Sequence, residues 1–115
     1  MHKILVINND FDTMTLLKSW LEKRHYQVEY TGNGEQVPQL MNDFQPDVVI
    51  VDVLQNKVAE QLKANDETAQ VPILMMTGYA NAQDYPNDNS DDVIQKPFNL
   101  KLLEKKIERL KERKN

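Results

Sequence analysis

The sequence predicts an α/β domain built on a doubly wound, five-stranded parallel sheet with helices on both faces. Short apolar runs alternate along the chain with stretches that repeat apolar residues at helical spacing. The clearest apolar runs are continuous, which is typical of strands covered on both faces. With 115 residues, the chain has room for a single domain over residues 1–115 with one core.

The five strands are predicted from apolar runs that end at polar or turn residues. Three runs are wholly apolar, one alternates with polar residues, and the last is only two residues long. In chain order they are residues 4–7, 28–30, 48–51, 73–76 and 93–94. Alternation of strands and helices favours parallel pairing with right-handed crossovers.

The first predicted helix follows the first strand and places Met14, Leu17 and Leu21 on one face. Asp10 or Asp12 is suited to cap its start, because a carboxylate accepts hydrogen bonds from the free N–H groups there. The first crossover is therefore predicted to be an amphipathic helix.

The middle of the chain predicts two shorter helices. The first of them covers residues 37–44, where Pro38 fits the first turn because its missing N–H costs least there. Val58 and Leu62 indicate a shortened third helix that ends near Asn65.

The last part of the chain predicts one irregular segment and one helix. Residues 79–90 are polar, contain Pro86 and show no helical period, so a loop or frayed helix replaces the fourth helix. Asn99 is expected to cap the last helix. Its inner face is predicted from Leu103, Ile107 and Leu110.

The carboxyl ends of parallel strands meet at one edge of the sheet, where sites of such folds form. The residues that follow the strands there are Asn8-Asn9-Asp10, Asp52, Thr77 and Lys96. A carboxylate such as Asp52 can attack a phosphoryl group to form an acyl phosphate. An ammonium and a hydroxyl would then contact phosphoryl oxygens, and a divalent cation, normally Mg²⁺, would bridge the groups.

Four stretches resemble the receiver family of two-component response regulators, which has a flavodoxin-like fold. They are KILVI at 3–7, QPDVVIVDV at 45–53, VPILMMTG at 71–78 and DDVIQKPF at 91–98. The resemblance implies that Asp52 is the phosphoacceptor and that Thr77 and Lys96 contact the phosphoryl group. It also implies a cis peptide bond before Pro97.

The resemblance implies a stand-alone signalling domain in a phosphorelay rather than an enzyme. A histidine kinase or phosphotransfer protein would supply the phosphoryl group. Output would go to a downstream protein target by contact. A second copy of the chain, forming a homodimer, is a further candidate partner. The chain lacks cysteine, and no apolar run is long enough to span a membrane, so we expect a cytoplasmic protein.

The chain departs from the family at the positions that usually supply acid. Receivers place two acidic residues after the first strand, whereas this chain has Asn8 and Asn9. We therefore expect impaired Mg²⁺ binding, with Asp52, Asp10 and Asn9 as the remaining metal ligands. With few competing carboxylates, Asp52 is expected to pair directly with Lys96.

A second departure concerns the relay inside the domain. Val93 stands where the family has an aromatic switch residue, so the usual coupling of Thr77 to a ring at that position cannot operate. An alternative function is therefore a pseudo-receiver, which is an interaction module that works without phosphorylation. A small-molecule site in the strand-end crevice is disfavoured because no glycine-rich loop follows the first strand.

Charge is unevenly distributed along the chain. Residues 100–115 hold seven Lys or Arg and three Glu, a net charge of +4, so the remaining 99 residues carry −8 of the total of −4. We interpret the cations as complements of the dipole of the last helix. Nucleic acid is disfavoured as a partner because the rest of the chain would repel phosphate.

Overall fold

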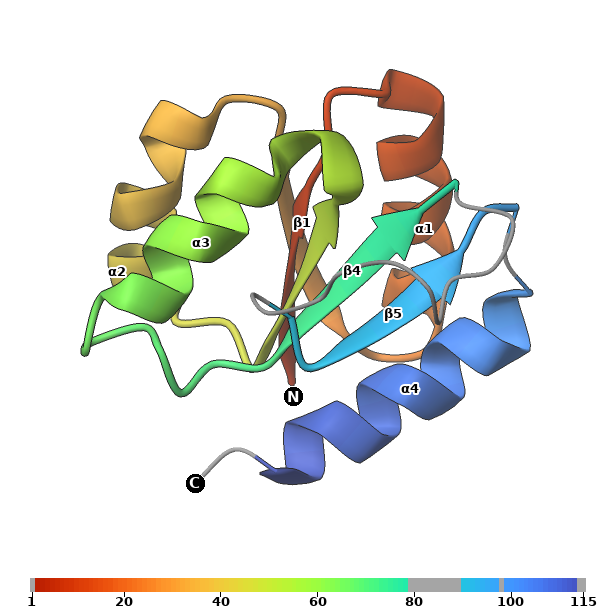
Figure 1. Ribbon diagram of the computed structural model, residues 1–115. Coiled ribbons are helices and arrows are strands. Elements are labelled where there is room, and N and C mark those ends of the chain that lie inside the picture. Colours follow the sequence, from red (N-terminus) through yellow and green to blue (C-terminus); the bar gives the residue numbers. More distant parts are fainter. Residues whose placement is uncertain (1, 79–89, 98, 114–115) are drawn as a thin grey trace.

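The computed structural model describes residues 2–78, 90–97 and 99–113 of the chain. All five predicted strands are present and form one parallel sheet in the order β2-β1-β3-β4-β5. Their bounds are Lys3–Ile7 (β1), Gln27–Thr31 (β2), Val48–Asp52 (β3), Ile73–Thr77 (β4) and Asp92–Gln95 (β5). The predicted doubly wound α/β fold is confirmed (Figure 1).

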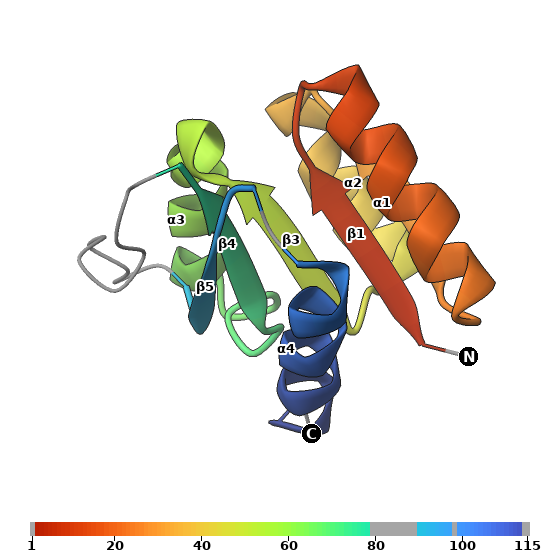
Figure 2. The ribbon, with the colours of Figure 1, turned by 90° about the vertical axis from the view of Figure 1, so that its right-hand side faces the viewer.

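Among the described residues, four helices lie on the two faces of the sheet. Their bounds are Phe11–Lys23 (α1), Val37–Phe44 (α2), Asn56–Ala64 (α3) and Leu100–Arg113 (α4). Single 3₁₀ turns precede α2 and α3, at Gly34–Gln36 (η1) and Val53–Gln55 (η2). Helices α1 and α4 lie on one side of the sheet, and α2 and α3 lie on the other (Figures 1 and 2).

Alternating strand residues form two separate hydrophobic layers, as the pleat of a strand requires. In β1, Ile4 and Val6 pack against α1 and α4, whereas Leu5 and Ile7 pack against α2 and α3. The side chains of all four are fully buried. Burial on both faces explains why these strands read as continuous apolar runs in the sequence.

The last helix agrees with its prediction. The Asn99 side-chain oxygen accepts hydrogen bonds from the backbone N–H groups of Lys101 at 2.8 Å and Leu102 at 3.2 Å. Its inner face is buried as expected, through Leu103, Ile107 and Leu110. The third helix also ends as predicted, since Asn65 follows its last residue.

One prediction is wrong and another is not tested. Asp10 occupies the N-cap position of α1, but its side chain makes no capping hydrogen bond to the backbone and accepts one from the Thr13 hydroxyl instead. The segment predicted to replace the fourth helix lies, over residues 79–89, outside the described residues. In the part of the chain that the structure describes, no helix is both long and apolar enough to cross a membrane.

Candidate functional site

The ends of three adjacent strands bring the predicted acceptor residues to one edge of the sheet. Asp52 is the last residue of β3 and pairs with Met76 of β4. Thr77 is the next residue of β4 and pairs with Gln95, directly before Lys96. Asp52, Thr77 and Lys96 are therefore neighbours at the carboxyl end of the sheet.

Asp52 forms a direct ion pair with Lys96. The Lys96 Nζ donates to Asp52 Oδ2 at 2.6 Å. Asp52 is only 4% exposed, whereas the side chain of Lys96 is 33% exposed. The expected direct pair is present, and its carboxylate lies in an environment where little water screens the charge.

The second carboxylate oxygen of Asp52 serves the backbone. Asp52 Oδ1 accepts from the N–H of Leu54 at 2.9 Å and so caps the 3₁₀ turn η2. This bond fixes the carboxylate plane relative to the loop that follows β3. Both oxygens of the candidate acceptor are thus held by donors before any ligand binds.

Asn8 contributes a third donor that sequence reasoning did not identify. It is 1% exposed, and its Nδ2 makes a long hydrogen bond of 3.5 Å to Asp52 Oδ2. Its Oδ1 accepts from the N–H of Asp10 at 2.7 Å, and its own N–H donates to the Thr31 carbonyl at 3.0 Å. Its position was a usable signal, because an amide directly after a buried strand needs hydrogen-bond partners when it is buried.

The other two side chains predicted as metal ligands lie at exposed positions, whereas Asp52 is buried. Asn9 is exposed, and the exposed carboxylate of Asp10 accepts from Thr13. Among the described residues, no three His, Cys, Asp or Glu side chains form a group that could hold a metal ion. Mg²⁺ relies on carboxylates and keeps several waters, so one carboxylate that is already paired with an ammonium does not fit it.

Thr77 and Lys96 are fixed by the backbone around them. Thr77 is fully buried, and its carbonyl accepts from the N–H of Lys96 at 2.7 Å. The peptide bond between Lys96 and Pro97 is cis. Val93, at the position of the missing aromatic switch, packs into the core on the side of α2 and α3.

Gly32 lets the loop after β2 approach the loop after β1. A Cβ at this position would lie 3.2 Å from Cα of Asn9 and 3.3 Å from the carbonyl oxygen of Asn8. The carbonyl of Gly32 accepts from Gln55 Nε2 at 3.1 Å, so the loop after β3 joins the same cluster. The loops after β1, β2 and β3 therefore support Asn8 and Asp52 together.

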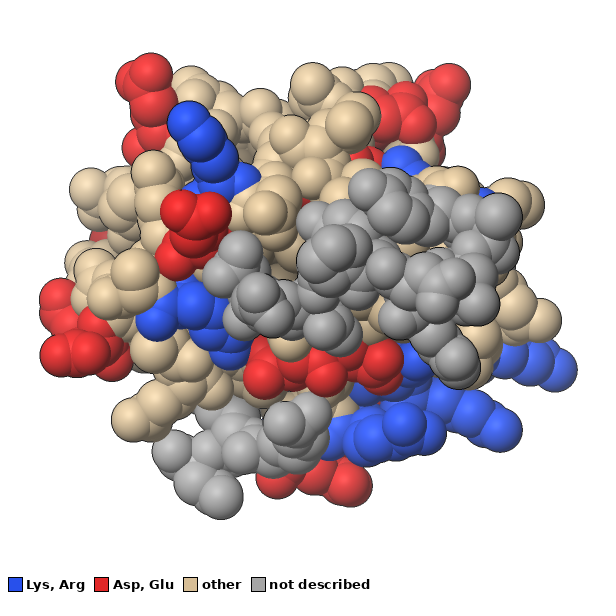
Figure 3. All heavy atoms as spheres, in the orientation of Figure 1, with Lys and Arg blue, Asp and Glu red and all other residues tan. Residues whose placement is uncertain are grey.

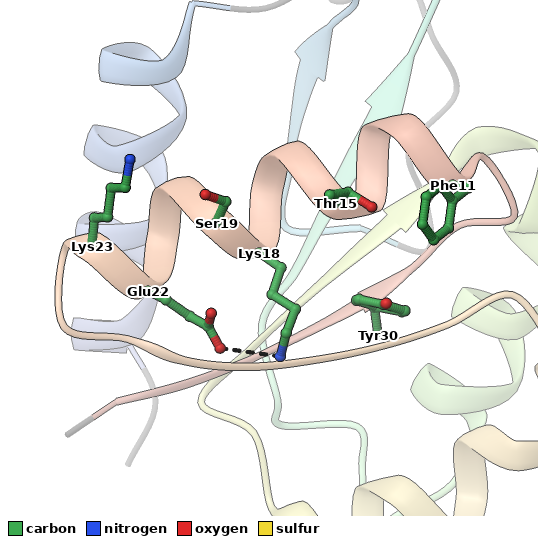
Figure 4. A pocket seen from close by; sticks show the side chains of 7 residues that line it. All are labelled: Phe11, Thr15, Lys18, Ser19, Glu22, Lys23 and Tyr30. Atoms are coloured by element: carbon green, nitrogen blue, oxygen red, sulfur yellow. Dashed lines mark ion pairs between the residues drawn. The ribbon is translucent and has the colours of Figure 1, made fainter.

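A surface hollow of about 550 Å³ lies away from this site, on α1 and β2. Figure 4 shows Phe11 near Tyr30 at one end of the lining, and Lys18 and Glu22 pointing toward one another farther along α1. The ion pair between Lys18 and Glu22 is 3.1 Å long. Lys18 also donates to the Val28 carbonyl at 2.9 Å, which covers part of the free edge of β2. Neither Asp52 nor Lys96 lines the hollow.

Basic side chains gather over α4 (Figure 3). Two of them are neutralised locally: Lys106 pairs with Asp92 at 3.1 Å and Lys111 pairs with Glu108 at 2.9 Å. These pairs reduce the positive field of the helix. The interpretation of the cations as complements of the dipole of α4 stays a prediction.

The chain matches the family described as the response regulator receiver domain over residues 4–108. It is 33% identical over 112 residues to the transcriptional regulatory protein CpxR of Escherichia coli K12, covering 93% of this chain and 48% of that protein. It is 31% identical to the nisin biosynthesis regulatory protein NisR of Lactococcus lactis, covering 93% and 49%. The chain thus spans about half the length of these curated relatives.

Solved structures of receiver proteins have the same fold as this chain. The receiver domain of a signal transduction histidine kinase from Syntrophus aciditrophicus superposes with a TM-score of 0.87 at 25% identity, over 97% of this chain and 91% of that one. The response regulator TrrA of Thermotoga maritima, solved in complex with Mg²⁺ and BeF, superposes with a TM-score of 0.82 at 25% identity, over 96% and 99%.

Proposed function

The chain belongs to the response regulator receiver domain family, and from this premise we propose that it acts in two-component signal transduction with Asp52 as its phosphoacceptor. Receiver domains are signalling modules. One observation carries the proposal: the buried carboxylate of Asp52 lies at the carboxyl end of the sheet, 2.6 Å from the ammonium of Lys96.

The arrangement suits the formation of an acyl phosphate. A carboxylate oxygen of Asp52 would attack phosphorus, and the leaving group would depart on the opposite side. The Lys96 ammonium would then contact a phosphoryl oxygen, because the Asp52 carboxyl loses its charge when it becomes the acyl part of a mixed anhydride. The Thr77 hydroxyl, at the end of β4, is the second contact that we propose.

We propose that both the donor of the phosphoryl group and the target that responds to it are proteins. A histidine kinase or a phosphotransfer protein supplies the phosphoryl group, and a downstream protein target reads the state of Asp52. Such an exchange takes place in the cytoplasm. This part of the proposal rests on family membership.

The test is chemical labelling of the protein with acetyl phosphate, followed by intact mass measurement. We expect the wild-type chain to gain one phosphoryl group and the Asp52→Asn variant to gain none. Asp43→Asn, at an exposed position of α2, is a matched control that removes a carboxylate elsewhere and should leave labelling unchanged. Equal labelling of wild type and Asp52→Asn would contradict the assignment.

A pseudo-receiver is the second candidate function, and Asn8 and Asn9 favour it because they stand at the two positions after β1 that are usually acidic in receivers. In that case the fold would be kept for protein contacts, and the pair between Asp52 and Lys96 would be permanent. No mass gain under any labelling condition, with a folded protein, would support this candidate over the first.

A further inference from the structure

The residues around Asp52 do not fit a divalent cation, and we infer that the Lys96 ammonium and the Asn8 amide together replace one at this site. The inference rests on the proposed function, because it describes how Asp52 accepts a phosphoryl group. It goes beyond that proposal by making the reaction independent of Mg²⁺. Three features of the site support it.

The first feature is charge. Lys96 Nζ lies 2.6 Å from Asp52 Oδ2, so the single positive charge already balances the carboxylate. A dication within a few ångströms of the same oxygen would be repelled by this ammonium in a poorly screened environment. The described residues offer no group of three His, Cys, Asp or Glu side chains that would offset that repulsion.

The second feature is the orientation of Asn8. Its oxygen, the only atom of this amide that could ligate a metal, accepts from the N–H of Asp10 at 2.7 Å. Its nitrogen therefore faces Asp52, and it donates to Oδ2 at 3.5 Å. Turning the amide would leave the Asp10 N–H without its acceptor and bring two oxygens together, which makes Asn8 a positioning residue for Asp52.

The third feature is the reaction itself. With acetyl phosphate, an Asp52 oxygen forms a bond to phosphorus while the bond from phosphorus to the acetate oxygen breaks. Acetate leaves with the electron pair, and no proton changes place. The charge on the phosphoryl oxygens stays spread over them throughout, and preorganised N–H and ammonium donors stabilise such charge without a metal.

The first test asks whether Mg²⁺ binds to the wild-type chain. The Tm is measured in MgCl₂ and compared with the Tm in NaCl of equal ionic strength. A site with a Kd tenfold below the added Mg²⁺ would raise Tm by roughly 5 °C. We expect no rise in the wild type and a rise in Asn8→Asp/Asn9→Asp. The charge-matched variant Asn42→Asp/Asn65→Asp, exposed at α2 and after α3, should show none. A rise in the wild type would overturn the inference, even if the first double variant failed to fold.

The second test is labelling with acetyl phosphate in EDTA and in MgCl₂. We expect labelling rates that agree within about twofold for the wild type, whereas loss of a metal that stabilised the transition state would cost more than tenfold. A tenfold loss in EDTA would overturn the inference while leaving Asp52 as the acceptor. No labelling in either buffer would contradict the proposed function, and the Tm measurement would still decide whether Mg²⁺ binds.

Discussion

At the scale of single residues, the site is a buried carboxylate held by three donors. Lys96 supplies charge, Leu54 supplies a backbone N–H, and Asn8 supplies an amide N–H. A buried charge of this kind is stable only when it is paired and hydrogen-bonded. Stability and chemistry therefore depend on the same few contacts.

Removing the ammonium should expose this dependence. We expect Lys96→Met to lower the free energy of unfolding by about 1–2 kcal/mol, because Asp52 would stay buried without its counter-charge. The value is below that of a fully buried pair because the side chain of Lys96 is 33% exposed. Urea denaturation followed by fluorescence of the single Trp would measure it.

Two further variants make this stability measurement specific. Lys57→Met, at an exposed position on α3, should change the free energy of unfolding by less than about 0.5 kcal/mol. Asp52→Asn/Lys96→Met should recover part of the loss, because an amide needs no counter-charge. Unchanged stability of Lys96→Met would show that the ion pair does not hold Asp52.

At the scale of elements, the two helices on one face of the sheet begin in different ways. Asn99 caps α4 through two backbone N–H groups, whereas the Asp10 side chain at the start of α1 bonds only the Thr13 hydroxyl. The start of α1 is fixed instead by Asn8, whose oxygen accepts the Asp10 N–H. The helix next to the site is therefore anchored by a site residue.

This difference predicts unequal costs of losing each cap residue. We expect Asn99→Ala to destabilise the protein by about 1 kcal/mol, and Asp10→Ala by less, about 0.5 kcal/mol from the helix dipole alone. Asn99→Asp should keep most of the stability because a carboxylate accepts the same bonds. Thermal unfolding measures both, and a larger loss in Asp10→Ala would contradict the assignment.

At the scale of the whole molecule, Tyr26 joins the start of β2 to α4. Its hydroxyl donates to Glu108, which also accepts from Lys111 at 2.9 Å. Burial, followed by the hydrogen bond to Glu108, raises the pKa of Tyr26 well above its usual range. The hydrogen bonds from Tyr26 and Lys111 lower the pKa of Glu108.

These shifts predict how stability changes with pH. The contribution of Glu108 is present above its unfolded pKa of about 4.3 and is lost as the pH falls below it. The contribution of Tyr26 is present below about pH 10 and is lost as the pH rises above it, because only the unfolded chain then ionises. Tyr26→Phe should flatten both limbs of the stability curve.

Measuring the free energy of unfolding between about pH 3 and 11 would test this link. Tyr30→Phe is the matched control, since Tyr30 is 37% exposed and outside the pair. If Tyr26→Phe and the wild type showed the same pH dependence, the predicted link between the contact of Tyr26 with Glu108 and the pH dependence of stability would be wrong.

Much of this fold could be predicted from periodicity alone. Strands buried on both faces give unbroken apolar runs, and Asn99 is a cap that local chemistry specifies. The backbone register at the strand ends then brings Asp52, Thr77 and Lys96 together, independently of the orientation of their side chains. The pair between Asp52 and Lys96 was also predictable, because few carboxylates near the site compete for the ammonium.

Side-chain choices between local partners could not be predicted in the same way. The sequence does not say whether Asn8 turns its oxygen or its nitrogen toward Asp52, because that depends on the N–H of Asp10. Nor does it show that Asp10 bonds Thr13 rather than the backbone. Such outcomes depend on differences of about 1 kcal/mol between hydrogen bonds of similar chemistry.

The most direct test of the central claim is the position of the acyl phosphate. The protein is labelled with acetyl phosphate, reduced with borohydride to convert an aspartyl phosphate into homoserine, and digested for peptide mass mapping. We predict homoserine at residue 52 in the wild type, with no reduced residue in Asp52→Asn. Homoserine at another aspartate, or no conversion at residue 52, would contradict the assignment of Asp52 as the acceptor.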